Sequence, residues 1–123
     1  MARILIIDDD RDAREMVRMV LEQAGHFVIE AENGQDGLDM LERVRPDLVL
    51  LDVQMPVMSG SVFVAELARR GEVRPFEVIT MSGHVDARHA PARWFLAKPI
   101  ETSLLLAVVA DFCTRRQVPA LAR

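Results

Sequence analysis

The sequence has one cysteine, no long hydrophobic run and no excess of positive charge, and each absence excludes a class of protein. Cys113 has no partner for an internal disulfide and no nearby Cys or His to complete a zinc site. The apolar stretches are too short to span a membrane, and a net charge of −4 argues against binding nucleic acid through a basic face. The N-terminus runs directly into a strand pattern, so we expect no secretory signal and a cytoplasmic protein.

Short apolar runs alternate with longer segments of helical period along the 123 residues. This alternation is typical of repeated strand–helix units around a parallel sheet. We therefore predict one α/β domain, a five-stranded parallel sheet flanked by helices on both faces in a doubly wound arrangement. The strands are expected at residues 3–7, 27–30, 47–51, 76–81 and 94–97.

Helices are expected between these strands, at residues 11–24, 37–44 and 62–70, and after the last strand at 102–114. Only ten residues, one of them Pro91, lie between Gly83 and the last strand, which predicts a shortened or irregular fourth helix. Residues 1–114 would then form the domain. Residues 115–123, which contain Pro119 and little periodicity, are expected to be a short C-terminal tail.

Carboxylates follow two of the predicted strands. Asp8, Asp9 and Asp10 come after the first strand, and Asp52 comes at the end of the third. Because the carboxyl ends of parallel strands meet at one edge of the sheet, these side chains should converge. Crowded carboxylates repel one another unless a cation neutralises them, so we predict a Mg²⁺ site that includes Asp8 or Asp9 together with Asp52. One Asp52 oxygen is then placed to attack a phosphorus atom.

A cation and a hydroxyl complete the predicted site. Lys98 follows the fifth strand, where its ammonium would offset the charge of a phosphoryl group. A hydroxyl at the end of the fourth strand would donate to another phosphoryl oxygen. Thr80 and Ser82 both qualify, because residues two apart in a strand point to the same face.

Together these segments resemble the receiver domain of two-component response regulators, from Ile4 to about Phe112. The matching segments are residues 6–10 (Ile-Ile-Asp-Asp-Asp), 47–56 (Asp-Leu-Val-Leu-Leu-Asp-Val-Gln-Met-Pro) with Met58 and Gly60, 82–83 (Ser-Gly) and 95–99 (Phe-Leu-Ala-Lys-Pro).

The resemblance implies a role for each residue of the site. Asp52 would be the phosphoacceptor, and Asp8 and Asp9 would bind Mg²⁺ directly or through water. The backbone carbonyl of Gln54 would be a further metal ligand. In this family the peptide bond that follows Lys98 is usually cis, which would aim the lysine into the site.

The resemblance also implies a switch. Ser82, followed by a glycine that leaves room for the phosphate, would be the switch hydroxyl. Phe95 would be the aromatic residue that changes orientation when Ser82 moves toward the phosphate. Gln54 and His84, two positions after the phosphoacceptor and the switch hydroxyl, would govern how water reaches the acyl phosphate and hence its lifetime.

The chain departs from the family in having only fifteen residues between Ser82 and Lys98. The shortening falls on a face through which many receivers dimerise or signal, so we expect an altered output surface, which leaves a homodimer open. Met19, off the core face of the first helix, is a candidate anchor for a phosphodonor. In the last helix one predicted apolar face contains Leu104, Leu105, Val108, Val109 and Phe112, and a second stripe contains Leu106, Ala110 and Cys113.

We therefore interpret the chain as a stand-alone receiver that takes a phosphoryl group from a histidine kinase or phosphotransfer protein and signals through contact with a downstream protein. It would be no conventional enzyme, although it would assist its own phosphotransfer and dephosphorylation. Two alternatives stay open. One is a haloacid-dehalogenase-like phosphatase that uses Asp8 as nucleophile and Asp10 as acid, and the other is a receiver-like adaptor that works without phosphorylation.

Overall fold

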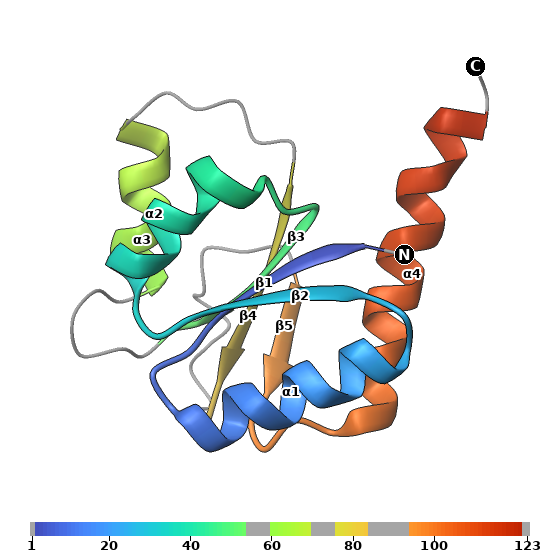
Figure 1. Ribbon diagram of the computed structural model, residues 1–123, viewed down its shortest axis with the longest axis horizontal. Coiled ribbons are helices and arrows are strands. Elements are labelled where there is room, and N and C mark those ends of the chain that lie inside the picture. Colours follow the sequence, from blue (N-terminus) through green and yellow to red (C-terminus); the bar gives the residue numbers. More distant parts are fainter. Residues whose placement is uncertain (1, 54–59, 70–75, 84–93, 122–123) are drawn as a thin grey trace.

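A five-stranded sheet, with every neighbouring pair of strands parallel, forms the centre of the computed structural model (Figure 1). The structure describes residues 2–53, 60–69, 76–83 and 94–121. The strand order is β2-β1-β3-β4-β5, which confirms the predicted fold class. The strands are β1 (Arg3–Ile7), β2 (Phe27–Ala31), β3 (Leu48–Asp52), β4 (Glu77–Ser82) and β5 (Trp94–Ala97).

In the described part of the chain, two pairs of helices cover the two faces of the sheet. Figure 1 shows α1 (Arg11–Gln23) and α4 (Thr102–Leu121) on one face, and α2 (Gly34–Val44) and α3 (Gly60–Arg69) on the other. Side chains alternate along each strand, so Ile4 and Ile6 enter the core under α1 and α4, whereas Leu5 and Ile7 enter the core under α2 and α3. The central strands are therefore apolar on both faces, which makes their ends the places where polar side chains are tolerated.

The turn between β1 and α1 is fixed by a helix cap. The Asp10 carboxylate accepts hydrogen bonds from the backbone N–H groups of Asp12 and Ala13 at 3.0 and 3.4 Å. These two donors would otherwise lack partners in the first turn of the helix. Asp10 is thus occupied at the start of α1, and only Asp8 and Asp9 remain between strand and cap.

Two helix boundaries differ from the sequence prediction by three residues or more. Helix α2 begins at Gly34 instead of residue 37, because Asn33 caps it by accepting a hydrogen bond from the Asp36 N–H at 2.8 Å. Helix α4 continues to Leu121, so the expectation of a helix end at residue 114 was wrong. Beyond that point Arg115 pairs with Asp111 one turn earlier, at 3.2 Å, and arginine and glutamine are good helix formers.

The predicted core face of the last helix needs one correction. Leu105, Val109 and Phe112 are buried as expected, but Leu104 is 48% exposed. The partly buried Leu106 and Cys113 of the second stripe pack against the core together with Val108. The predicted short fourth helix lies outside the described residues. Among the described residues, no helix combines the length and apolar character needed to cross a membrane.

Close packing of α2 on β1 depends on the absence of a side chain at Gly37. An added Cβ would overlap the Cδ1 atom of Ile7 and lie 3.4 Å from Cε2 of Phe63, and both residues are fully buried. We expect Gly37→Ala to lower the free energy of unfolding by about 1–3 kcal/mol through overpacking, against an opposing gain of about 1 kcal/mol in helix propensity. Urea denaturation measures the net change, with the exposed Gln35→Ala as control. A Gly37→Ala protein as stable as the wild type would contradict this packing account.

Candidate functional site

The predicted site residues converge at the carboxyl edge of the sheet. Asp8 follows β1, Asp52 ends β3, Ser82 ends β4 and Lys98 follows β5. Backbone hydrogen bonds hold these ends in register, since the Val53 N–H donates to the Met81 carbonyl at 3.0 Å and the Lys98 N–H donates to the Ser82 carbonyl at 2.8 Å. Residues separated by up to 90 positions in the sequence thus lie within hydrogen-bonding reach.

Three carboxylates form a cluster suited to a hard cation. Oxygen atoms of Asp8, Asp9 and Asp52 all lie within 4.8 Å of one another. Asp8 and Asp52 are buried, at 1% and 4% exposure, whereas Asp9 is exposed and leaves the cluster open to solvent. Carboxylate oxygens with room for water are the ligands that Mg²⁺ prefers. The donor set therefore fits the ion that the sequence predicts.

Lys98, the only lysine in the sequence, faces the two buried carboxylates. Its Nζ atom lies 2.7 Å from Oδ2 of Asp8 and 3.4 Å from Oδ2 of Asp52. Partial burial acts to lower the pKa of the Lys98 ammonium, but the hydrogen bond and charge of Asp8, with the charge of Asp52, outweigh it and raise the pKa. The Lys98–Pro99 peptide bond is cis, as the family resemblance implied. The ammonium is therefore held charged beside both buried carboxylates.

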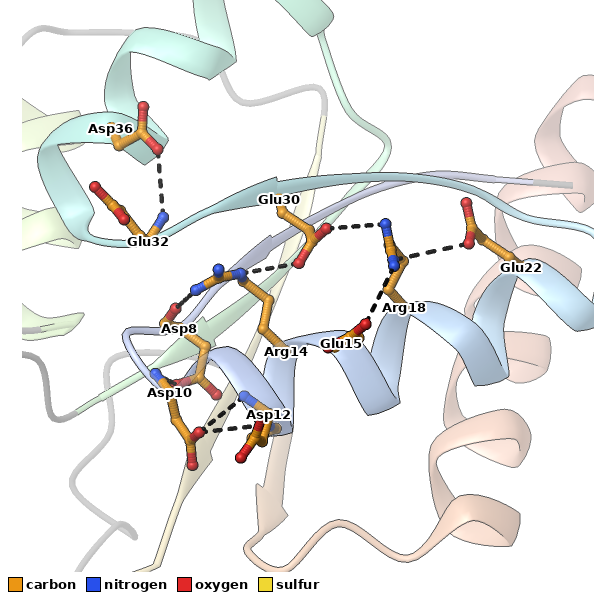
Figure 2. Close-up of polar contacts among 11 residues, drawn as sticks. Asp8, Asp10, Asp12, Arg14, Glu15, Arg18, Glu22, Glu30, Glu32 and Asp36 are labelled. Atoms are coloured by element: carbon orange, nitrogen blue, oxygen red, sulfur yellow. Dashed lines mark hydrogen bonds and ion pairs between the residues drawn. The ribbon is translucent and has the colours of Figure 1, made fainter.

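Asp8 is held at every polar group of its backbone and side chain. Its N–H donates to the Ala31 carbonyl at 3.1 Å, and its Oδ1 atom accepts from the Asp10 N–H at 2.9 Å. Its carbonyl accepts from Nη1 of Arg14 at 2.7 Å, a contact that Figure 2 shows between α1 and the end of β1. Arg14 was not among the predicted site residues. The one available signal was the position of Arg14 in the first turn of a helix, where the positive end of the helix dipole disfavours a cation that has no acceptor nearby.

The two candidate hydroxyls differ in their place along β4. Both Thr80 and Ser82 are buried. Thr80 is in register with Leu51, whereas Asp52 is in register with Met81, so Ser82 lies just beyond Asp52 at the edge of the sheet. Phe95 of β5 is in register with Thr80 of β4, and its side chain is 41% exposed. The predicted roles of Gln54 and His84 fall on residues outside the described part of the chain.

A cavity of about 550 Å³ opens beside the acidic cluster, between α1 and the segment after β5. Carboxylates and the Lys98 ammonium line it together with apolar side chains from α1 and from the segment after β5. The lining residues are Asp8, Asp10, Asp12, Ala13, Met16, Val17, Lys98, Pro99 and Ile100. Met19, whose side chain is 53% exposed, lies about one helical turn after Met16 in α1. Next to the site, α1 therefore exposes Met16 and Met19 among the acidic residues Asp12 and Glu15.

Replacing Lys98 with methionine tests its contacts with the carboxylates. Without Mg²⁺ we expect Lys98→Met to lower the free energy of unfolding by about 1–3 kcal/mol, because a buried charged acceptor loses its donor. Because Mg²⁺ would neutralise the same carboxylates, it should raise the melting temperature of the variant more than that of the wild type. Arg69→Met, which removes an exposed pair with Glu66, is the control and should change little. An equal Mg²⁺ response in all three proteins would contradict the shared-carboxylate account.

The same variant has a defined dependence on pH. A lysine whose folded pKa lies above its unfolded value of 10.5 contributes stability that is complete below that value. The contribution is lost as pH rises through the folded pKa. The difference in unfolding free energy between wild type and Lys98→Met should therefore stay constant in the neutral range and shrink in strong alkali.

Comparison with known proteins agrees with this geometry. Residues 4–110 match the family model of the response regulator receiver domain. The chain is 34% identical over 115 residues to Protein PilH of Pseudomonas aeruginosa, an alignment that covers 89% of this chain and 95% of PilH. It is 38% identical over 109 residues to Response regulator MprA of Mycolicibacterium vanbaalenii, covering 85% of this chain and 47% of MprA.

A solved structure shows the same architecture. The chemotaxis response regulator CheY4 of Vibrio cholerae superimposes with a TM-score of 0.81 at 27% sequence identity, over 91% of this chain and 98% of CheY4. The family match spans most of the chain, and the strand order and acidic edge follow the receiver pattern. The chain therefore belongs to the response regulator receiver domains and is a phosphorylation-dependent switch of two-component signalling.

Proposed function

We propose that Asp52 accepts the phosphoryl group, from a phosphohistidine of a sensor histidine kinase or a histidine phosphotransfer protein. The observation that carries this proposal is the contact of Lys98 with Asp52 and with Asp8, and Lys98 and Asp8 also line the 550 Å³ cavity. Asp52 ends a strand and is in register with the buried β4, so its carboxylate has a fixed position relative to Lys98. A nucleophile held in this way loses little entropy on reaching the transition state.

In the proposed reaction one Asp52 oxygen attacks the phosphorus atom, the phosphorus–nitrogen bond of the donor breaks, and the imidazole nitrogen leaves with that electron pair. Mg²⁺, when bound, would neutralise the carboxylates and part of the phosphoryl charge. Asp8, Asp9 and the backbone carbonyl of Gln54 are its proposed ligands. Lys98 offsets the remaining negative charge without giving up a proton, because its raised pKa keeps it an ammonium.

The switch is proposed to pass from Ser82 to Phe95. Ser82 ends the strand beside β5, and the register between β4 and β5 aligns it with Ala97 and aligns Thr80 with Phe95. A hydroxyl that moves toward the phosphoryl group changes the space next to β5, and Phe95 is placed to respond. The partly exposed aromatic ring then reports phosphorylation to a protein partner at the β5 edge of the sheet.

The phosphodonor is proposed to dock on the α1 face beside the cavity. Met16 and Met19 are exposed there, and Asp12 and Glu15 lie around them. This combination suits a partner with an apolar contact surface and a basic rim.

The remaining proposals concern location, extent and phosphate lifetime. The proposed location is the cytoplasm, and residues 1–114 are the proposed receiver unit. Gln54 and His84 are proposed to set the lifetime of the acyl phosphate.

Intact mass spectrometry after incubation with Mg²⁺ and a small acyl-phosphate donor tests the phosphoacceptor. We expect a single phosphoryl adduct in the wild type that disappears without Mg²⁺ and in Asp52→Asn, since an amide cannot accept the group. Asp8→Asn, which keeps the acceptor, should still form the adduct, more slowly and at higher Mg²⁺ concentrations. Omitting the donor provides the baseline.

The pattern of adducts distinguishes the possible acceptors. An adduct that survives in Asp52→Asn and is lost in Asp8→Asn would place the phosphoryl group on Asp8 and contradict the proposal. If the wild type forms no adduct with small donors, and beryllofluoride with Mg²⁺ fails to raise its melting temperature, the phosphorylation-independent adaptor replaces the switch.

A further inference from the structure

We infer that Arg14, held by Glu30, is a positioning residue for the metal-binding carboxylates Asp8 and Asp9. The inference rests on the proposed function, in which these carboxylates hold Mg²⁺. Figure 2 shows the Arg14 side chain between β2, which carries Glu30, and the main chain at Asp8. Nothing in the proposed phosphotransfer uses Arg14 itself, yet it makes some of the shortest polar contacts around the site.

The guanidinium of Arg14 joins two elements of the fold. Its Nη1 atom donates to the Asp8 carbonyl at 2.7 Å, and its Nε atom donates to Oε1 of Glu30 at 2.9 Å. The side chain is only 14% exposed, so water competes little for these bonds. Because the guanidinium is planar and rigid, fixing one edge on Glu30 fixes the direction of the N–H group that reaches Asp8.

The Asp8 carbonyl is an effective point at which to hold the site. It belongs to the planar peptide unit that joins Asp8 to Asp9, so its orientation limits the backbone rotation of both residues. The Asp8 carboxylate itself is contacted by the Asp10 N–H, within the same turn, and by Lys98. The Asp8 N–H already bonds the Ala31 carbonyl of β2, and Asp10 caps α1. Arg14 adds a side-chain contact at the peptide between Asp8 and Asp9, and it joins that peptide to the body of α1 and, through Glu30, to β2.

Charge alone predicts the opposite effect of Arg14. A cation near a Mg²⁺ site repels the ion, so removing the cation should tighten binding. If Arg14 instead acts by orienting ligands, its removal should weaken binding, because outer hydrogen-bond partners hold metal ligands in place. The direction of the change in affinity therefore separates positioning from a simple field effect.

Arg18 is a matched control on the same helix face. It also pairs with Glu30, through Nη1 at 3.3 Å, and it approaches Glu15 and Glu22 at 3.9 and 3.8 Å (Figure 2). Its ion-pair partners among the described residues are all glutamates, and none belongs to the turn of Asp8. Arg18→Gln thus removes the same charge and one partner of Glu30 while leaving the Arg14–Asp8 contact in place.

Isothermal titration calorimetry with Mg²⁺ alone, on the folded full chain, tests the inference. We expect Arg14→Gln to raise the Mg²⁺ Kd about tenfold and Arg18→Gln to leave it near the wild-type value. Urea denaturation of each protein checks that the population titrated is folded. Arg14→Lys, which keeps the charge but loses the fork, should raise the Kd as Arg14→Gln does, and it replaces that variant if the glutamine protein does not fold.

Each result decides between the two claims. If Arg14→Gln or Arg14→Lys binds Mg²⁺ as tightly as the wild type, or more tightly, the positioning role is wrong although the Mg²⁺ site stands. A similar loss in Arg18→Gln would also overturn it, since the effect would then follow from charge or from Glu30. If the wild type itself does not bind Mg²⁺, the proposed function fails first and the inference falls with it.

Discussion

The contact between one ammonium and two buried carboxylates is the interaction on which the site depends. Asp8 and Asp52 are held close by backbone bonds of different strands, and two buried negative charges at this spacing are costly without a nearby positive charge. Lys98 supplies that charge in the described structure, and a divalent cation would add to it. The tightly packed sheet keeps the carboxyl ends of β1 and β3 in place although the carboxylates there repel one another.

This arrangement explains why the functional residues come from distant parts of the sequence. The core strands β1, β3 and β4 are mostly apolar along their length, and a polar side chain stands at or just after the carboxyl end of each, namely Asp8, Asp52 and Ser82. The described helices pack against both faces, so the polar side chains of different strands meet at the carboxyl edge between them. Ser82 and Phe95 lie on the neighbouring strands β4 and β5, so a change at the phosphorylation site has a short route to the outer strand of the sheet. In the proposed switch, a change at the carboxyl ends of the strands would therefore pass to the outer strand β5.

The sequence was sufficient for the sheet and for the convergence of Asp8, Asp9, Asp52 and Lys98, because both depend on strong local patterns, whereas the roles of these residues stay predictions. Strand ends were predicted within one residue, as with β3, whose last residue proved to be Asp52 itself. The start of α2 was missed because Gly34 and Gly37 disfavour helix, although Asn33 provides a cap that the pattern contains. The end of α4 was missed because Pro119 outweighed the helix-forming residues before it.

Arg14 and Glu30 could not be predicted for a different reason. They lie 16 residues apart, on a helix and a strand whose relative rotation is set by tertiary packing. No spacing rule in the sequence connects an arginine of α1 with a carbonyl at the end of β1. Such supporting contacts are visible only when the elements have been placed in space, although they determine how well the predictable residues are oriented.

A crystal structure of the protein with Mg²⁺ and beryllofluoride would test the central claim most directly, because beryllofluoride mimics a phosphoryl group on a carboxylate. The account predicts beryllofluoride on an Asp52 oxygen, with Lys98 Nζ within hydrogen-bonding distance of a fluorine and Mg²⁺ among Asp8, Asp9 and Asp52. Beryllofluoride bound to Asp8, or Mg²⁺ bound away from these three carboxylates, would contradict it.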